Sequence, residues 1–155
     1  MDFAAAARAL LLIAAASSAP WAVGRVFGNR WAWPLDFGYV LPDGKRLFGA
    51  HKTWRGLAAG IGACALIGWV LGPGWLVGCG VAALALVGDA LSSSIKRRMN
   101  RAPGSEVPGL DQVPESLLPL LVLHGPLGIS LGEALLLTLV FAGLDLLFTP
   151  LRHGR

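Results

Sequence analysis

Asp89 lies inside an otherwise apolar segment and is followed by hydroxyl and basic residues at helical spacing. Ser92, Ser93, Lys96 and Arg97 share one helical face with it. A carboxylate in an apolar helix is costly and usually functional. The stripe therefore predicts a divalent cation that bridges phosphates, with Lys96 and Arg97 at the water interface. The alternative is an Asp89–Lys96 ion pair that caps the helix.

Asp111 is a second candidate ligand, because it directly precedes another apolar segment. Mg²⁺ is typically held by one or two carboxylates together with substrate phosphates and water. Asp111 can supply the second carboxylate to the ion at Asp89. It can also act as a helix N-cap with Pro114 in the first turn, and the two roles are compatible.

A basic, glycine-rich segment between the first two apolar segments is a candidate phosphate site. Glycines let the backbone approach a ligand, and basic side chains form charge-assisted hydrogen bonds with phosphate. The alternative is a cytoplasmic loop that carries positive charge and turn glycines. The segment contains Lys45, Arg46, Lys52 and Arg55 between Gly44, Gly49 and Gly56. Asp145, in the last apolar segment, is a further site candidate, whereas His124 and Glu133 are interpreted as interfacial.

The composition favours a membrane protein. The chain has 155 residues, of which 55% are hydrophobic and 14% charged, and the mean hydropathy is +0.63. A soluble domain of this size cannot bury so much apolar surface, and a disordered chain would be far more polar. The net charge of +4 is interpreted as a membrane-topology signal, and no nucleic-acid partner is expected.

Five apolar segments predict an all-α, polytopic membrane protein that forms one domain over residues 1–155. A bilayer requires about 20 helical residues. The second segment is slightly short, and the fourth is too short to span unless it is a half-helix buried by its neighbours. The segments are about Phe3–Trp21, Gly56–Leu71, Trp75–Lys96, Ser116–Leu123 and Leu131–Phe148.

The distribution of basic residues predicts the orientation. Twelve of the 13 lie in the two long connections, at their edges or in the tail, which contains Arg152 and Arg155. Basic loops face the cytoplasm. We therefore expect a plasma-membrane protein with its N-terminus outside and its active site on the cytoplasmic side. A homodimer is compatible with the small residues Gly56, Gly60, Gly62 and Gly68.

The polar motifs resemble, in order, those of the CDP-archaeol synthase family, which is related to the phosphatidate cytidylyltransferases. The resemblance implies a Mg²⁺-dependent enzyme that transfers CMP from CTP to a membrane lipid phosphate and releases pyrophosphate. The motifs are Pro34–Gly38, Asp43–Lys45, Lys52–Gly56, Gly88-Asp89 with Ser94–Arg98, and Leu110–Gln112.

The resemblance also implies roles for particular residues. Asp89 and Asp111 would hold the metal, and the segment Lys52–Arg55 would help to hold CTP. Together with the residue patterns, this gives Asp89, Asp111 and Lys96 as catalytic candidates. The nucleotide- or phosphate-binding candidates are Lys45, Arg46, Lys52, Thr53, Arg55, Ser92, Ser93 and Arg97.

One position departs from the family pattern. The family often has a second acid three residues after the first, but here Pro114 occupies that place and Glu115 follows. Either Glu115 substitutes as a ligand with a shifted helix start, or the metal site has fewer ligands.

Ten Arg against three Lys suggest a GC-rich genome, so the acceptor could be an archaeal ether lipid phosphate or phosphatidic acid. The competing interpretation is a transporter or a non-catalytic membrane protein.

Overall fold

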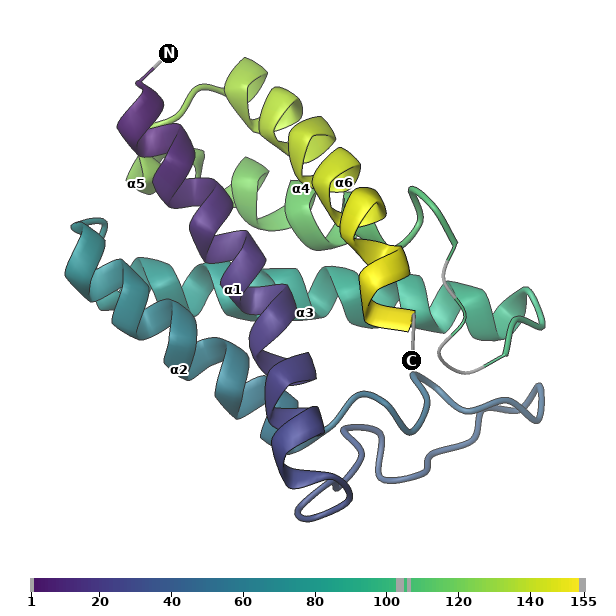
Figure 1. The fold of residues 1–155 in the computed structure, drawn as a ribbon. Coiled ribbons are helices and arrows are strands. Elements are labelled where there is room, and N and C mark those ends of the chain that lie inside the picture. The colour runs from purple at the N-terminus through teal and green to yellow at the C-terminus, as the bar shows by residue number, and fades with distance from the viewer. Residues whose placement is uncertain (1, 103–104, 106, 154–155) are drawn as a thin grey trace.

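The computed structural model describes residues 2–102, 105 and 107–153, with side chains up to residue 148. Arg155 and the side chain of Arg152 therefore lie outside the described residues. This part of the chain is helical, with two isolated β-bridges and no strand, so the all-α prediction is confirmed (Figure 1). The helices are α1 (Phe3–Phe27), α2 (Trp54–Leu71), α3 (Trp75–Arg98), α4 (Gln112–Val122), α5 (His124–Leu127) and α6 (Leu131–His153).

Four of these helices, α1, α2, α3 and α6, are long and apolar enough to cross a membrane. With its 11 residues, α4 is only about 17 Å long, roughly half the hydrocarbon thickness. The one-turn helix α5 follows it. The expectation of about five segments, one of them short or broken, agrees with this arrangement. Helix α1 continues past the predicted end at Trp21 because hydropathy marks only the apolar part of a helix.

Small residues let α3 pack directly against the backbones of its neighbours. A Cβ added at Gly78 would collide with the backbone of Cys64 in α2, and one at Gly88 would collide with the backbone of Pro114 in α4. Close backbone contact through small residues is typical of membrane helix pairs. Because Gly88 precedes Asp89, this contact fixes the carboxylate of Asp89 beside the first turn of α4.

Most glycines of α2 pack against other helices of the same chain. A Cβ at Gly56 would meet Pro20 of α1, one at Gly60 would meet both α1 and α3, and one at Gly68 would meet Gly74 and Gly78. Only the Cβ position of Gly62, among the four glycines named for helix pairing, has open space around it. Of these four glycines, only Gly62 is therefore open for a second copy to pack closely against it.

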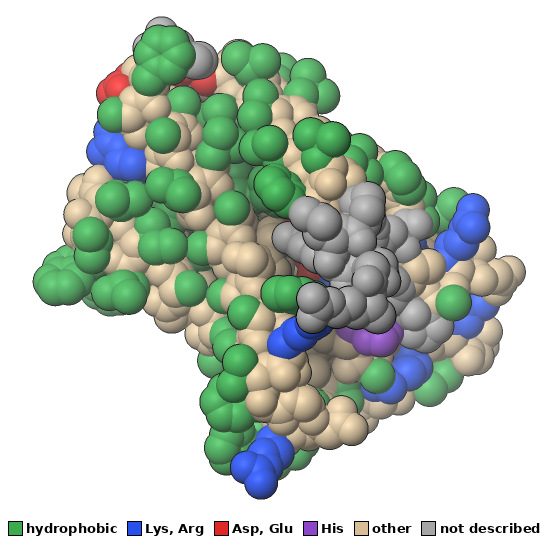
Figure 2. Space-filling view, in the orientation of Figure 1, with side chains coloured by type: hydrophobic (Ala, Val, Ile, Leu, Met, Phe, Trp, Pro, Cys, Tyr) green, Lys and Arg blue, Asp and Glu red, His purple; other side chains and the backbone are tan. Residues whose placement is uncertain are grey.

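Apolar side chains that face outward complete the membrane character. Leu139 is 68% exposed and Trp69 is 70% exposed, which suits contact with lipid rather than water. Figure 2 shows apolar side chains over the helices and most Lys and Arg side chains toward the end that carries the long loop. The inner core is made of Ala5, Ala9, Leu12, Ile13, Cys64, Val81, Ala85, Leu120, Leu137 and Phe141.

Asp36 organises the loop between α1 and α2, residues 28–53. Its buried carboxylate accepts hydrogen bonds from Arg46 at 2.5 Å and from the backbone N–H groups of Gly38 at 3.0 Å, Phe48 at 3.2 Å and Gly49 at 3.0 Å. Burial alone would raise the pKa of Asp36, but these donors lower it to about 2. The Pro34–Gly38 motif therefore has a structural function.

Two contacts attach this loop to the end of α3. Asp43 forms an ion pair with Arg98 at 3.1 Å, and the Lys45 ammonium donates to the carbonyl of Arg98 at 3.1 Å. The last loop residues then return across the helix ends to begin α2. This path carries Lys52 to the side of Asp89.

Candidate active site

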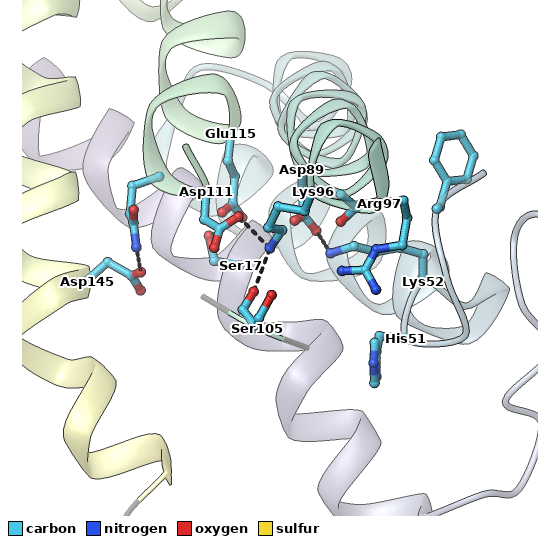
Figure 3. A pocket seen from close by; sticks show the side chains of 13 residues that line it. Ser17, His51, Lys52, Asp89, Lys96, Arg97, Ser105, Asp111, Glu115 and Asp145 are labelled. Carbon is cyan, nitrogen blue, oxygen red and sulfur yellow. Dashed lines mark hydrogen bonds and ion pairs between the residues drawn. The ribbon is translucent and has the colours of Figure 1, made fainter. Parts of the chain in front are cut away.

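A polar cavity of about 230 Å³ lies near the C-terminal ends of α1, α3 and α6 and the start of α4 (Figure 3). Its walls come from these four helices and the two long connections. Acidic, basic and hydroxyl side chains dominate the lining, in contrast to the apolar core. The lining residues are Ser17, Phe48, His51, Lys52, Asp89, Ser93, Lys96, Arg97, Ser105, Asp111, Gln112, Glu115 and Asp145.

Asp89 forms an ion pair with Lys52, which approaches from the loop (Figure 3). Both side chains are about one-fifth exposed, so the pair is shielded but reachable from the cavity. The expected alternative, an Asp89–Lys96 pair, is not formed. Ser93 lines the cavity with Asp89, whereas Ser92 is fully buried and donates its hydroxyl to the Asp89 carbonyl at 2.9 Å.

Lys96 instead forms an ion pair with Asp111 at 2.6 Å and donates to the carbonyl of Ser105 at 3.0 Å. The second carboxylate oxygen of Asp111 accepts the backbone N–H of Val107 at 2.9 Å. Asp111 stands at the N-cap position of α4, but its side chain makes no capping hydrogen bond there. Asp111 therefore occupies the predicted N-cap position with Pro114 in the first turn, while its carboxylate is directed to the cavity and its rim.

Two further carboxyl groups lie in the same cavity. Glu115, from the first turn of α4, accepts a hydrogen bond from the Ser17 hydroxyl at 2.5 Å. Asp145, from α6, accepts one from the Gln112 amide at 3.1 Å. Sequence reasoning missed Ser17, and it named Gln112 only as part of the motif Leu110–Gln112, without a role. The available signal for Ser17 was a hydroxyl within an apolar segment.

A second cavity of about 510 Å³ adjoins the first on the α1–α2 side. It adds Thr53 and Arg55, and it shares with the polar cavity Ser17, His51, Lys52, Asp89 and Glu115. The Thr53 hydroxyl accepts the backbone N–H of Gly56 at 3.1 Å and so caps α2. Arg55 donates to the carbonyls of Gly28 and Arg30, which holds the end of α1 against the start of α2.

Lys45 and Arg46 line neither of these two cavities. They line a third hollow of about 420 Å³, which shares Arg97 with the polar cavity and Ala50 with the second cavity. The Lys45 ammonium is bonded to the end of α3, and the Arg46 guanidinium is bonded to Asp36. The structure thus brings Lys52 together with Thr53 and Arg55, as expected, but not with Lys45 and Arg46.

The donor chemistry of the polar cavity suits a hard divalent cation. Its carboxylates and hydroxyls are oxygen donors of the kind that Mg²⁺ prefers. Four carboxyl groups face three basic side chains there, so phosphate-bearing ligands would need additional positive charge. In the described part of the chain, no three acidic, histidine or cysteine side chains converge on one metal position. Substrate phosphates and water would therefore complete the coordination.

Glu133 does not line this cavity, and its hydrogen bonds are local. Its carboxylate accepts the backbone N–H of Ser130 at 2.7 Å, and the Ser130 hydroxyl accepts the backbone N–H of Glu133 at 3.2 Å. This reciprocal pair is a capping box at the start of α6. Both cysteines, Cys64 and Cys79, are free thiols.

The chain matches the family model of CarS-like CDP-archaeol synthase over residues 8–151. It is 38% identical over 130 residues to the CDP-archaeol synthase of Pyrococcus furiosus, with 77% of this chain and 73% of that protein covered. For the enzyme of Thermococcus gammatolerans, the identity is 35% and the covered shares are 77% and 72%. The fold also superposes with a TM-score of 0.76 on a solved intramembrane enzyme for archaeal membrane lipid biosynthesis, with 31% identity and 92% and 90% of the two chains covered.

Membrane-length helices around a charged cavity place this chain in the class of multi-pass membrane enzymes. The family model and the similar sequences identify the chain more narrowly than this class does. The chain belongs to the CDP-archaeol synthase family, and it is therefore a CTP-dependent cytidylyltransferase of lipid biosynthesis. The resemblance seen in the motifs is confirmed, and the transporter or non-catalytic alternative is wrong.

Proposed function

We propose that the chain transfers CMP from CTP to the phosphate of an archaeal-type ether lipid. The observation that carries the proposal is the clustering of Asp89, Asp111, Lys52 and Lys96 in one cavity of a chain whose relatives are named CDP-archaeol synthases. In the reaction, an oxygen of the lipid phosphate attacks the α-phosphorus of CTP. One P–O bond forms, the bond to the β-phosphate breaks, and pyrophosphate leaves.

The cavity supplies charge and position rather than a general base. A phosphate monoester is mostly ionised near pH 7, so the attacking oxygen has no proton to lose. The difficulty is to bring two polyanions together, which cationic side chains and exact placement overcome. Lys52, Lys96 and Arg97 face the same space and would hold the phosphate oxygens.

Asp89 and Asp111 would hold Mg²⁺. Glu115 would be a further ligand, because it directly follows position 114, where the family often has its second acid. When bound, Mg²⁺ neutralises charge on the reacting phosphates. In the protein alone, lysine ammonium groups neutralise Asp89 and Asp111. The same ammonium groups lie in the cavity and are placed to turn to substrate phosphates.

The larger adjoining cavity would hold the nucleotide. Lys52, Thr53 and Arg55 line it together with His51 and the aromatic Trp21, which suits a triphosphate and a stacked base. Because CTP is cytoplasmic, the proposal places this end of the helices at the cytoplasmic face and the N-terminus outside. The excess of basic residues at this end supports that orientation.

The test is an in vitro assay with CTP labelled at the α-phosphate, Mg²⁺ and two acceptors, digeranylgeranylglyceryl phosphate and phosphatidic acid. We expect labelled CDP-lipid and pyrophosphate, with the ether lipid preferred. Asp89→Asn and Asp111→Asn should each abolish transfer without unfolding the protein in detergent. Glu133→Gln, in the capping box of α6, is the matched control and should retain activity. Near-normal, Mg²⁺-dependent transfer by either asparagine variant would remove that residue from the site.

A further inference from the structure

An apolar groove of about 310 Å³ opens between α1 and α6. Leu10, Leu11 and Ala14 form one wall, and Phe141, Leu144 and Phe148 form the other. Ser17 and Asp145 line its inner end, and both also line the polar cavity. The groove and the polar cavity therefore meet at Ser17 and Asp145.

The groove exists because α1 and α6 separate toward the charged end of the molecule. Figure 1 shows the two helices diverging in that direction, while α6 packs mainly on α4. The groove side chains are open to the surroundings: Leu11 is 53% exposed and Phe148 is 54% exposed. From Leu10 to Ser17 the groove follows α1 for about 10 Å at the helical rise of 1.5 Å per residue.

A lipid phosphate faces a geometric problem at this enzyme. Its phosphate must reach Lys52 and Lys96 inside the polar cavity, while its chains must stay in an apolar environment. A space that solves this must be apolar, open to the bilayer and continuous with the polar cavity. The α1–α6 groove has all three properties.

A smaller apolar hollow offers a comparison. It has a volume of about 170 Å³ and lies between α3 and α4, with Leu91, Leu117 and Leu121 in its walls. It shares no lining residue with the polar cavity. A chain lying there would not be led to the lysines by the walls of the hollow.

We propose that the α1–α6 groove binds an alkyl chain of the acceptor lipid and guides its phosphate past Ser17 and Asp145 into the polar cavity. This inference rests on the proposed transfer to a lipid phosphate. Ala14 is the position at which the groove can be closed with the least disturbance, because its side chain is exposed and lies between Leu10 and Ser17. Contact with alkyl chains there makes the groove a substrate-binding surface as well as part of the lipid-facing exterior.

The first experiment is kinetic and compares Ala14→Trp with Ala83→Trp, an exposed alanine on α3 that lies outside the groove. We expect Ala14→Trp to raise the KM for a long-chain lipid phosphate at least tenfold. Its KM for CTP and its turnover of a short-chain, water-soluble lipid phosphate should stay within about twofold of the parent. Ala83→Trp should match the parent throughout. An unchanged KM for the long-chain acceptor in Ala14→Trp would overturn the inference.

The second experiment needs no catalysis and no variant. The parent protein is photolabelled in vesicles with a dialkylglycerol phosphate that carries a diazirine in its chain, and with the matching lipid that lacks the phosphate. Labelling of Leu11, Leu144 and Phe148 should be several times stronger with the phosphate lipid, and labelling at Leu91 should be equal with both. Equal labelling at the groove would show bulk lipid only and would overturn the inference.

The two experiments separate this inference from the proposed function. A parent protein that transfers no CMP but shows phosphate-dependent labelling refutes the reaction and supports the groove. A parent protein that transfers CMP, while Ala14→Trp behaves as the parent, refutes the groove and supports the reaction.

Discussion

Replacing Gly88 by alanine tests whether the close contact between α3 and α4 sets the geometry of the active site. A Cβ at Gly88 would lie 2.8 Å from the backbone nitrogen of Glu115 and closer still to the carbonyl of Pro114. Ordinary van der Waals contact begins at about 3.4 Å, and the carbonyl carbon of Pro114 would lie at only 2.5 Å, so the first turn of α4 must withdraw by at least 0.9 Å. Asp111 and Glu115 would move with it, away from Asp89.

The expected cost has two parts. Overpacking of this kind destabilises a protein by about 1–3 kcal/mol. Misplacement of reacting groups by about 1 Å lowers the rate by roughly a hundredfold. We therefore expect Gly88→Ala to lower kcat for CMP transfer by between tenfold and a hundredfold, with a modest fall in Tm.

The assay is CMP transfer at saturating CTP and lipid phosphate, together with thermal unfolding in detergent. Gly62→Ala is the control, because a Cβ at Gly62 meets nothing within 4 Å. It should keep kcat and Tm within error of the parent. If Gly88→Ala keeps both values as well, the α3–α4 contact does not position the acids and the reasoning fails.

Three other perturbations test the loop. Lys52→Ala should weaken transition-state binding of CTP by about 1.5–3 kcal/mol, which would be measured as a fall in kcat/KM. Lys45→Ala should lower kcat/KM much less, and equal effects of the two substitutions would show that Lys52 has no special role. Burial raises the pKa of Asp36, but hydrogen bonds from Arg46 and the backbone outweigh burial and lower that pKa to about 2. The carboxylate therefore stabilises the loop above about pH 4 and ceases to do so as the pH falls toward 2. Proteolysis of the loop by an acid-stable protease should therefore accelerate between pH 4 and 2, and Asp36→Asn should remove that dependence. A cysteine placed by Asp43→Cys should react with an impermeant thiol reagent only after the cells are permeabilised; labelling in intact cells would reverse the topology.

Hydropathy located the membrane-length helices because runs of about 18 or more apolar residues have few other uses. It also indicated that the fourth segment is too short to span. The helix ends were less predictable: α1 accommodates Pro20 and continues beyond Trp21 to Phe27, past the apolar part of its sequence. The glycine face of α2 was interpreted as a surface for a second copy, but sequence alone does not show that Gly60 and Gly68 are used against α1 and α3.

The polar motifs identified residues of the cavity correctly, but the sequence did not show which of these residues form ion pairs with one another. An isolated carboxylate in an apolar helix pointed to Asp89, and the start of the next segment pointed to Asp111; both lie in one cavity. The alternative interpretation of the helical spacing was an Asp89–Lys96 pair, but Lys52, 37 residues earlier, pairs with Asp89. Such a pairing depends on the path of the whole loop, which Asp36 and Arg98 determine through contacts distant in sequence.

The ion pairs of the cavity are better explained by function than by stability. Buried or half-buried pairs seldom stabilise a fold more than apolar packing would, because desolvation offsets the attraction. Here two such pairs, Lys52–Asp89 and Lys96–Asp111, stand in one cavity with two more carboxyl groups. Under the proposed function, each pair would hold a cation for phosphate and an anion for a metal in the same space, and removal of either partner alone would leave the other uncompensated. A cavity that binds two polyanions needs both kinds of group in place before the substrates arrive.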